Sequence, residues 1–275
     1  MYSVDGSSTG KVELPKVFAE DVRDDLIKRA VLSEESEEFQ PKGVFYRAGL
    51  QTTARYVGRK EAYHSLKNRG GAMLPRELYP KGRIGRVRVV PWAVKGRRAH
   101  PPKVAKVLVE RINKREKAKA LRSAIAATSR KEIVSKKHIF ADVTIPLVVD
   151  EKCEGMKKTK EVFALFEKMK ISKDVERAMN GRKARTGARY GGTKTPWSIL
   201  IVSATAVPLL KAARNMPGVT VKTVDKLQVR DLAPGGVPGR LTVWRKAAFL
   251  QRDLSERSFL PSRHLLAVSC LLTNG

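Results

Sequence analysis

The chain has 275 residues, 42% of them hydrophobic, and its 56 lysines and arginines outnumber 27 acidic residues to give a net charge of +29. This length allows one or two domains with a sizeable core, but the charge requires a partner with many phosphates or an anionic membrane surface. The absence of an 18-residue apolar run and of a signal-peptide pattern argues against a membrane-spanning or secreted protein, and two cysteines fit a reducing cytosol.

The first 40 residues are expected to begin a globular α/β domain. Residues 1–14 predict a β-hairpin, because apolar residues alternate on both sides of a turn signal at residues 5–6. Residues 20–35 predict an amphipathic helix, because apolar residues recur every four positions from Phe18 to Ala30. Acidic residues near its start favour the positive end of the helix dipole.

Residues 41–103 predict a long, extended, basic loop inserted into this domain. The segment has sixteen lysines and arginines against two acids, a net charge of +14, and glycine, proline and aromatic residues recur through it. No apolar period persists, so the segment cannot bury enough surface to offset its ordering entropy. A loop of this length is typically functional or disordered, and this composition would be ordered by a polyanion.

We expect the polyanion to be RNA. Arginine, which binds phosphates through two parallel hydrogen bonds and stacks on bases, outnumbers lysine by ten to six. Aromatic residues among the cations suit unpaired bases, and no helix-turn-helix, zinc finger or basic zipper pattern favours DNA. The candidate RNA-binding residues of the loop are Arg47, Arg55, Arg59, Arg69, Arg76, Arg83, Arg86, Arg88, Trp92, Lys95, Arg97, Arg98, His100 and Lys103.

The chain after the loop predicts the remainder of the α/β domain. Residues 101–102, both proline, predict the start of a helix over 104–128, and a shorter helix is expected over 130–137. Strands are expected at 145–150, 198–203, 219–224 and 241–244. Helices are expected at 157–169, 175–179, 209–215 and 245–254. This alternation predicts a mainly parallel, doubly wound, Rossmann-like sheet.

A second basic stretch, residues 180–196, adds Arg182, Arg185 and Arg189 to the candidate RNA-binding residues, because it carries five cations and no acid.

Catalytic and cofactor patterns are missing from the sequence. The four histidines lack the spacing of a zinc site, no G-x-S-x-G run occurs, and nothing identifies a base for Cys153. No G-x-G-x-x-G turn follows a strand, and residues 192–195 differ from a P-loop because they precede their strand. We therefore predict no catalytic residue, no metal and no cofactor.

Several separated runs resemble the archaeal branch of the universal ribosomal protein L-four family of the large subunit. The resemblance covers approximately residues 1–250, with the runs in the same order. The runs are VKGRRAHPPK (94–103), LRSAIAAT (121–128), LPKVF (14–18), DLIKRAV (25–31), DLAPG (231–235) and GRLTVW (239–244).

The resemblance implies a structural constituent of the large ribosomal subunit in the cytoplasm, with an α/β domain on the outside and a loop reaching into the rRNA. It implies a role in early assembly and binding to the 5′ part of the large-subunit rRNA. The loop tip, expected near residues 67–86, would help to line the nascent-peptide exit tunnel beside the L-twenty-two family protein. Residues 95–98 would belong to the base of the loop.

The predicted domain organisation has four parts. Residues 1–40 start the globular domain, 41–103 form the loop, 104–254 complete the domain, and 255–275 form an atypical C-terminal tail that does not resemble the family. The alternative functions are an RNA-modifying enzyme with a basic arm and a basic membrane-surface protein. The first lacks an acid/base constellation, and the second lacks a basic amphipathic helix with bulky apolar residues.

Overall fold

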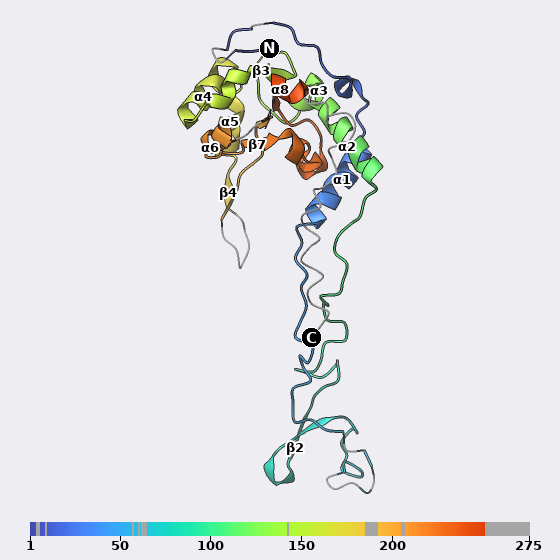
Figure 1. The fold of residues 1–275 in the computed structure, drawn as a ribbon. Coiled ribbons are helices and arrows are strands. Elements are labelled where there is room, and N and C mark those ends of the chain that lie inside the picture. Colours follow the sequence, from blue (N-terminus) through green and yellow to red (C-terminus); the bar gives the residue numbers. More distant parts are fainter. Residues whose placement is uncertain are drawn as a thin grey trace, which may run out of the picture. The chain divides into compact units, whose positions relative to one another are not determined.

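The computed structural model describes residues 1–250 except 4, 5, 9, 57, 60, 62–64, 142, 185–191, 205 and 206. The chain divides into two compact units, each described by itself. The α/β unit comprises Met1–Glu38 and the chain from Val109 onward, and the basic unit comprises Phe39–Leu108 (Figure 1). None of the helices in the described ranges has the length and apolar character needed to cross a membrane.

The α/β unit is built on a four-stranded sheet. Its strands are β3 (Leu147–Val149), β8 (Thr242–Arg245), β6 (Leu200–Ser203) and β7 (Thr220–Thr223), hydrogen-bonded in that order. All three pairings are parallel, and Ile201 lies opposite Val221 on one side and Val243 on the other. Central β6 is buried along its whole length, as expected for a short aliphatic strand that is covered on both faces.

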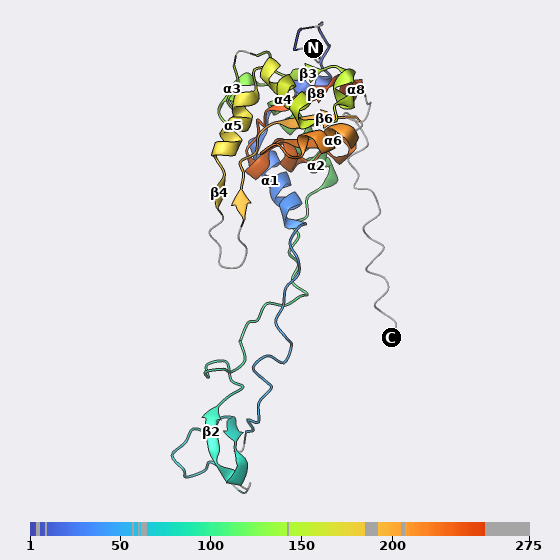
Figure 2. The same ribbon diagram turned by 90° about the vertical axis from the view of Figure 1, so that its left-hand side faces the viewer.

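The two faces of the sheet belong to two separate hydrophobic clusters. Ile201 on β6 packs into one cluster, while its neighbours Leu200 and Val202 pack into the other. This division follows from the strand period of two, which points successive side chains to opposite faces. Helices therefore cover both faces, and Figure 2 shows α6 and α1 on different sides of the strands.

One face is covered by α4 (Thr159–Lys168), α5 (Ser172–Asn180) and α6 (Val207–Ala213). Helix α4 buries Val162, Leu165 and Phe166, which recur at the helical spacing of three and four. Glu161 caps this helix, because its carboxylate accepts hydrogen bonds from the amides of residues 157 and 158.

The other face is covered by α1 (Asp24–Ser36), α2 (Lys114–Ala127) and the short α7 (Val229–Leu232). The buried carboxylate of Glu34 on α1 accepts hydrogen bonds from the amides of Val229 and Arg230, at the start of α7, and pairs with Lys117 on α2. Phe18, in the 3-10 turn η1 (Lys16–Ala19), packs edge-to-face on buried Trp244 with ring centroids 5.4 Å apart. The Glu34 contacts link the three helices to one another, and the Phe18 contact joins η1 to the sheet.

The prediction of a mixed α/β protein with a parallel sheet is confirmed. All four expected strands and the expected helices at 157–169, 175–179 and 209–215 are present, with shifted ends. The helix expected over 130–137 is α3 (Lys131–Ser135), and α8 (Lys246–Leu250) forms the described part of the helix expected over 245–254.

The hairpin predicted over 1–14 is present only in part, because its chain turns back at Ser7 and Ser8 and the predicted pairing of residues 12–14 does not form. Tyr2 forms an antiparallel bridge with Ser8 and a parallel bridge with Val149, so it extends the β3 edge of the sheet. Residues 10–15 lie in no strand, and Leu14 is exposed. Of this prediction, residues 4, 5 and 9 lie outside the described residues.

Two helix starts were also predicted wrongly. Helix α1 begins at Asp24 instead of residue 20, because the chain first forms η1 and then runs extended to Arg23, whose amide donates to Ser123 Oγ at 2.7 Å. Helix α2 begins at Lys114, where the Asn113 side chain accepts a hydrogen bond from the Arg115 amide. Residues 104–113 are not helical, and Val107 in this stretch is 77% exposed.

Candidate nucleic-acid interface

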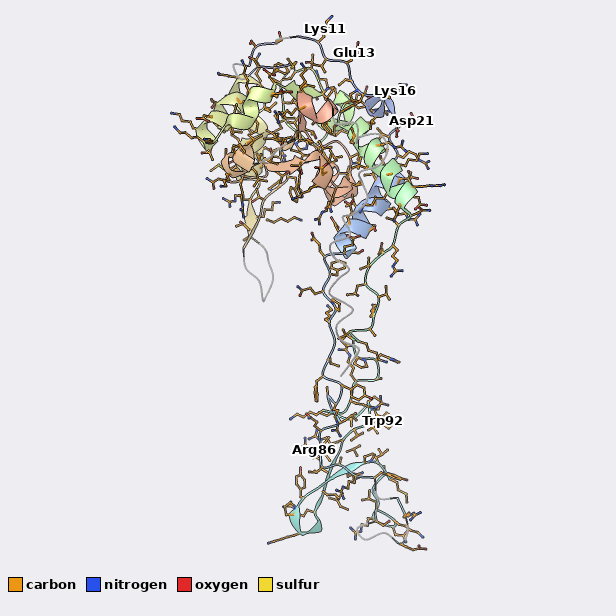
Figure 3. All side chains as sticks on the ribbon, viewed as in Figure 1. Lys11, Glu13, Lys16, Asp21, Arg86 and Trp92 are labelled. Atoms are coloured by element: carbon orange, nitrogen blue, oxygen red, sulfur yellow. The ribbon has the colours of Figure 1, made fainter. Side chains whose placement is uncertain are left out.

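The basic unit has almost no hydrophobic core. Leu66 is the one hydrophobic side chain that is buried among its described residues. Aromatic side chains are instead presented to solvent, with Tyr46 94% and Trp92 72% exposed. Figure 3 shows side chains projecting outward along this segment, Arg86 and Trp92 among them. Burial of apolar surface therefore contributes little to the order of this unit.

Close backbone approaches hold together the two limbs of the basic unit, residues 39–55 and 76–108. The amide of Val44 donates to the Pro102 carbonyl at 3.3 Å, and the backbones of Arg55 and Arg76 form a two-way bridge. Gly49 has a φ of +77°, and a Cβ at this position would lie 2.6 Å from the carbonyl oxygen of Gly96. A larger residue at position 49 would therefore force the limbs apart.

A small hairpin consists of β1 (Arg76–Leu78) and β2 (Ile84–Val87), joined through the 3-10 turn η2 (Pro80–Gly82), and Glu77 on β1 forms an ion pair with Arg88 just after β2. Arg88 Nε donates to Glu77 Oε1 at 2.7 Å, and the Tyr79 hydroxyl donates to Glu77 Oε2 at 3.0 Å. The hydrogen bond from Arg88 lowers the pKa of Glu77. Arg88 also donates to the Val94 carbonyl, so it cross-links the hairpin to the following chain.

Most predicted RNA-binding side chains are exposed. Arg76 and Arg88 are half-buried, while Arg185 and Arg189 lie outside the described residues. The exposed members are Arg47, Arg55, Arg59, Arg69, Arg83, Arg86, Trp92, Lys95, Arg97, Arg98, His100, Lys103 and Arg182. Their role in RNA binding stays a prediction, but the structure leaves these thirteen accessible to a ligand.

A shallow groove near the ends of the basic unit brings several cations together. It is lined by Lys42, Arg98, His100, Lys103, Lys106 and three apolar residues. Lys42 comes from one limb and the others come from the second, so the paired limbs create the groove. Four permanent positive charges around one concave surface suit a phosphate backbone.

The second basic stretch also forms a paired structure. Strands β4 (Lys183–Ala184) and β5 (Thr193–Lys194) are antiparallel, with Lys183 opposite Lys194. Both lysines and Arg182 are exposed. Like charges placed directly opposite each other destabilise a strand pair, which is a cost that a bound polyanion removes.

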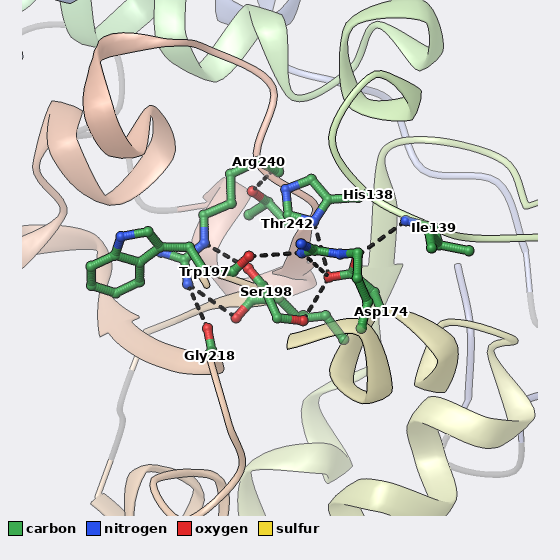
Figure 4. Close-up of polar contacts among 10 residues, drawn as sticks. His138, Ile139, Asp174, Trp197, Ser198, Gly218, Arg240 and Thr242 are labelled. Carbon is green, nitrogen blue, oxygen red and sulfur yellow. Dashed lines mark hydrogen bonds and ion pairs between the residues drawn. The ribbon is translucent and has the colours of Figure 1, made fainter. Parts of the chain in front are cut away.

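A buried polar cluster in the α/β unit contains His138, Asp174 and Ser198, the residue types of a hydrolytic triad (Figure 4). Asp174 lies between the other two, with Oδ2 2.9 Å from His138 Nδ1 and 2.6 Å from Ser198 Oγ. A catalytic triad needs the histidine between the nucleophile and the acid. Ser198 is also fully buried, so this cluster stabilises the fold and does not present a nucleophile.

Arg177 completes the surroundings of Asp174. Its guanidinium donates to both carboxylate oxygens, at 2.8 and 3.3 Å. Burial alone raises the pKa of Asp174, but the hydrogen bonds from His138, Arg177 and Ser198 outweigh it and hold the pKa well below its usual range.

Sequence reasoning missed a neighbouring pair, Trp197 and Arg240. The fully buried Arg240 guanidinium lies 5.0 Å from the Trp197 ring centroid, while Trp197 is 52% exposed. Arg240 is distant in sequence, but Trp197 directly follows the second basic stretch, and an aromatic residue at this place was an available signal.

The described residues offer neither a metal-binding cluster nor an activated thiol. In the described ranges, His, Cys, Asp and Glu side chains form no group of three that could hold a metal ion. Burial raises the pKa of the Cys153 thiol to about 11, so it stays protonated at neutral pH and is a poor nucleophile.

Comparisons with known proteins identify a ribosomal protein family that matches most of the chain. Residues 12–253 match the model of the Ribosomal protein L4/L1 family. The chain is 46% identical over 261 residues to the large ribosomal subunit protein uL4 of Methanocaldococcus jannaschii. The matched region covers 94% of this chain and 98% of that protein. It is 44% identical to the protein of that name from Methanococcus maripaludis strain C6, over 90% of this chain and 95% of the relative. The Pyrobaculum aerophilum protein is 42% identical, over 90% and 86% respectively.

Proposed function

The chain belongs to the ribosomal protein L4/L1 family, and we propose that it is a structural constituent of the large ribosomal subunit that binds the subunit's rRNA. The relatives are large-subunit ribosomal proteins over nearly their whole length, and their family is structural rather than enzymatic. This function places the protein in the cytoplasm, as part of the large ribosomal subunit.

The observation that carries the proposal is the basic unit, Phe39–Leu108, in which exposed cations and aromatic rings replace a core. Leu66 is its one buried hydrophobic residue among those described, and Trp92 and Tyr46 are open to solvent. Such a segment lacks the apolar burial to order itself, whereas close-packed rRNA supplies phosphates for the arginines and bases for the rings.

The basic unit also supports a more specific proposal about where the protein lies in the subunit. We propose that residues 41–103 act as a loop that enters the rRNA, with its tip near residues 67–86. There it would help to line the nascent-peptide exit tunnel beside the L-twenty-two family protein. The β1–β2 hairpin lies in this tip region, and its Glu77–Arg88 pair gives it a defined backbone from which Arg83 and Arg86 extend.

We also propose that the α/β unit is a doubly wound, Rossmann-like scaffold without a nucleotide site. Its parallel sheet and helices on both faces support this description, and the glycine-rich turn required for a dinucleotide is missing after β6. The fold would then serve to position the basic surfaces.

Sedimentation of the tagged protein in cell extracts tests the proposed function. We expect it to co-sediment with large subunits and to resist a moderate salt wash, because many contacts hold it. Recovery in the free protein fraction, with large subunits lacking it, would contradict the proposal. A chain in which residues 45–98 are replaced by a short Gly/Ser link provides a matched control that keeps the α/β unit.

A further inference from the structure

Trp197 is held in one orientation at the surface of the α/β unit. Arg240, 0% exposed, places its guanidinium 5.0 Å from the indole centroid. The guanidinium lies over the ring and is inaccessible, so one face of the indole is covered, while Trp197 as a whole remains 52% exposed. Cation–π attraction favours this stacked arrangement.

Arg240 cannot move away from the indole without losing several hydrogen bonds. Nε donates to the Ser198 carbonyl at 2.7 Å, Nη1 donates to the Asp231 carbonyl at 2.9 Å and Nη2 donates to the Gly218 carbonyl at 3.1 Å. Burial lowers the pKa of Arg240 to about 10, so the guanidinium remains charged at neutral pH. Figure 4 shows Arg240 beside the Trp197 ring, with its hydrogen bonds to Ser198 and Gly218. The inner face of the indole is therefore covered by a fixed positive charge.

The backbone of Trp197 is fixed as well, and cations lie close to it. Arg177 Nη2 donates to the Trp197 carbonyl at 2.9 Å. A Cβ on Gly181 would lie 2.8 Å from the Pro196 ring, so residues 181 and 196 are neighbours. Exposed Arg182, and the paired Lys183 and Lys194, therefore lie next to the residues that carry the indole.

We infer that Trp197 is a stacking platform for one unpaired base of a single-stranded RNA segment, whose flanking phosphates contact Arg182, Lys183 and Lys194. A rigid aromatic ring with one open face can stack on any base, and adjacent cations hold the backbone on either side of it. The inference deepens the proposed rRNA-binding function, and it assigns a base contact to the α/β unit that is independent of the basic unit.

Tryptophan fluorescence tests this inference in the full chain. The chain has three tryptophans, so Trp92→Phe leaves exposed Trp197 and buried Trp244 as the emitting groups. We expect oligoadenylate to quench the Trp197 emission and shield it from acrylamide, because stacking needs a free base. A duplex RNA with the same number of phosphates should leave that emission largely unchanged, since its bases are already stacked. Equal quenching by both RNAs would overturn the inference, and this readout does not depend on any variant of Trp197 folding.

The affinity of Trp197 variants for oligoadenylate provides a second test. Trp197→Ala should weaken oligoadenylate binding by about 5- to 150-fold, the effect of losing one base–aromatic stack. Its salt dependence should stay unchanged because no phosphate contact is removed. Trp197→Tyr should retain most of the affinity, and Val237→Ala, at an equally exposed apolar site of the same unit, should bind like the parent. Equal binding by Trp197→Ala and the parent would overturn the inference alone, whereas a parent that binds no RNA would overturn the proposed function.

Discussion

Arg88 donates a hydrogen bond of 2.7 Å to Glu77, and the side chains of this pair are just 14% and 16% exposed. The pair neutralises one of the two acids in residues 41–103 and occupies an arginine that sequence reasoning assigned to RNA. Arg86, two positions earlier, is exposed and available.

This difference predicts opposite effects of two substitutions. Arg86→Ala should weaken RNA binding and reduce the slope of log affinity against log salt by about one, because one phosphate contact is lost. Glu77→Gln should strengthen binding and steepen the slope by up to about one, because it removes a negative charge and releases Arg88. Binding titrations at several salt concentrations measure both. Weaker binding by Glu77→Gln would mean that the pair is needed to shape the hairpin.

The charge of the basic unit predicts a strong dependence of rRNA binding on salt. If about ten phosphates are neutralised, the slope of log affinity against log salt should lie at roughly −7 to −9. Filter binding to large-subunit rRNA fragments between low and moderate salt measures it. A nearly flat plot would contradict an electrostatic interface.

The scarcity of buried apolar residues in the basic unit predicts its protease sensitivity. In the free protein, trypsin should cleave first between Arg47 and Arg98, and the same bonds should resist cleavage in assembled subunits. Replacing residues 45–98 with a short Gly/Ser link should leave the α/β unit folded and weakly bound to rRNA, but should disturb late assembly. Equal resistance of the segment in both states would show that it folds by itself.

The buried carboxylate of Asp174 predicts a loss of stability at low pH. Its folded-state pKa is held below the usual value, so its contribution is present above an unfolded pKa of about 3.9 and is lost as pH falls below that value. Asp174→Asn should lower the free energy of unfolding by ~3–5 kcal/mol at neutral pH, because it removes the buried carboxylate that pairs with half-buried Arg177 and accepts hydrogen bonds from Ser198. Denaturant unfolding at pH 7 and pH 3 measures the change. The variant should lose less stability than the parent between the two pH values, and equal losses would contradict the assignment.

The limits of the family match predict that the end of the chain is dispensable for assembly. The match ends at residue 253, so a chain lacking residues 256–275 should still enter large subunits. Quantifying this truncated protein in purified subunits beside the full-length protein tests the boundary. Its absence from the subunits would place a necessary contact in the tail.

The sequence was most informative where one local pattern dominated. The aliphatic run that contains β6 predicted a buried strand, and the spacing of Val162, Phe166 and Met169 predicted α4. In residues 104–113, the prolines at 101–102 suggested a helix start, but tertiary contacts decided otherwise. Glu110 exchanges hydrogen bonds with Ser33 and Ser36 at the end of α1, which holds this stretch extended until Asn113 caps α2.

The site was predictable as a charge pattern but not as a set of contacts. Composition identified the exposed cations of the basic unit, because exposure needs no specific partner. It could not distinguish Arg88, which pairs with Glu77 across the hairpin, from Arg86. The Arg240–Trp197 stack likewise depends on residues 43 positions apart, whose proximity follows from the parallel register of β6 and β8.

Strand β6 contributes side chains to both hydrophobic clusters, with Ile201 in one and Leu200 and Val202 in the other. Displacing this strand removes packing partners from the helices on both faces at once, so neither cluster can persist without the other. The α/β unit should therefore melt cooperatively, in a single step. A newly made chain then presents the proposed RNA-binding surfaces of this unit on a fully folded scaffold or not at all.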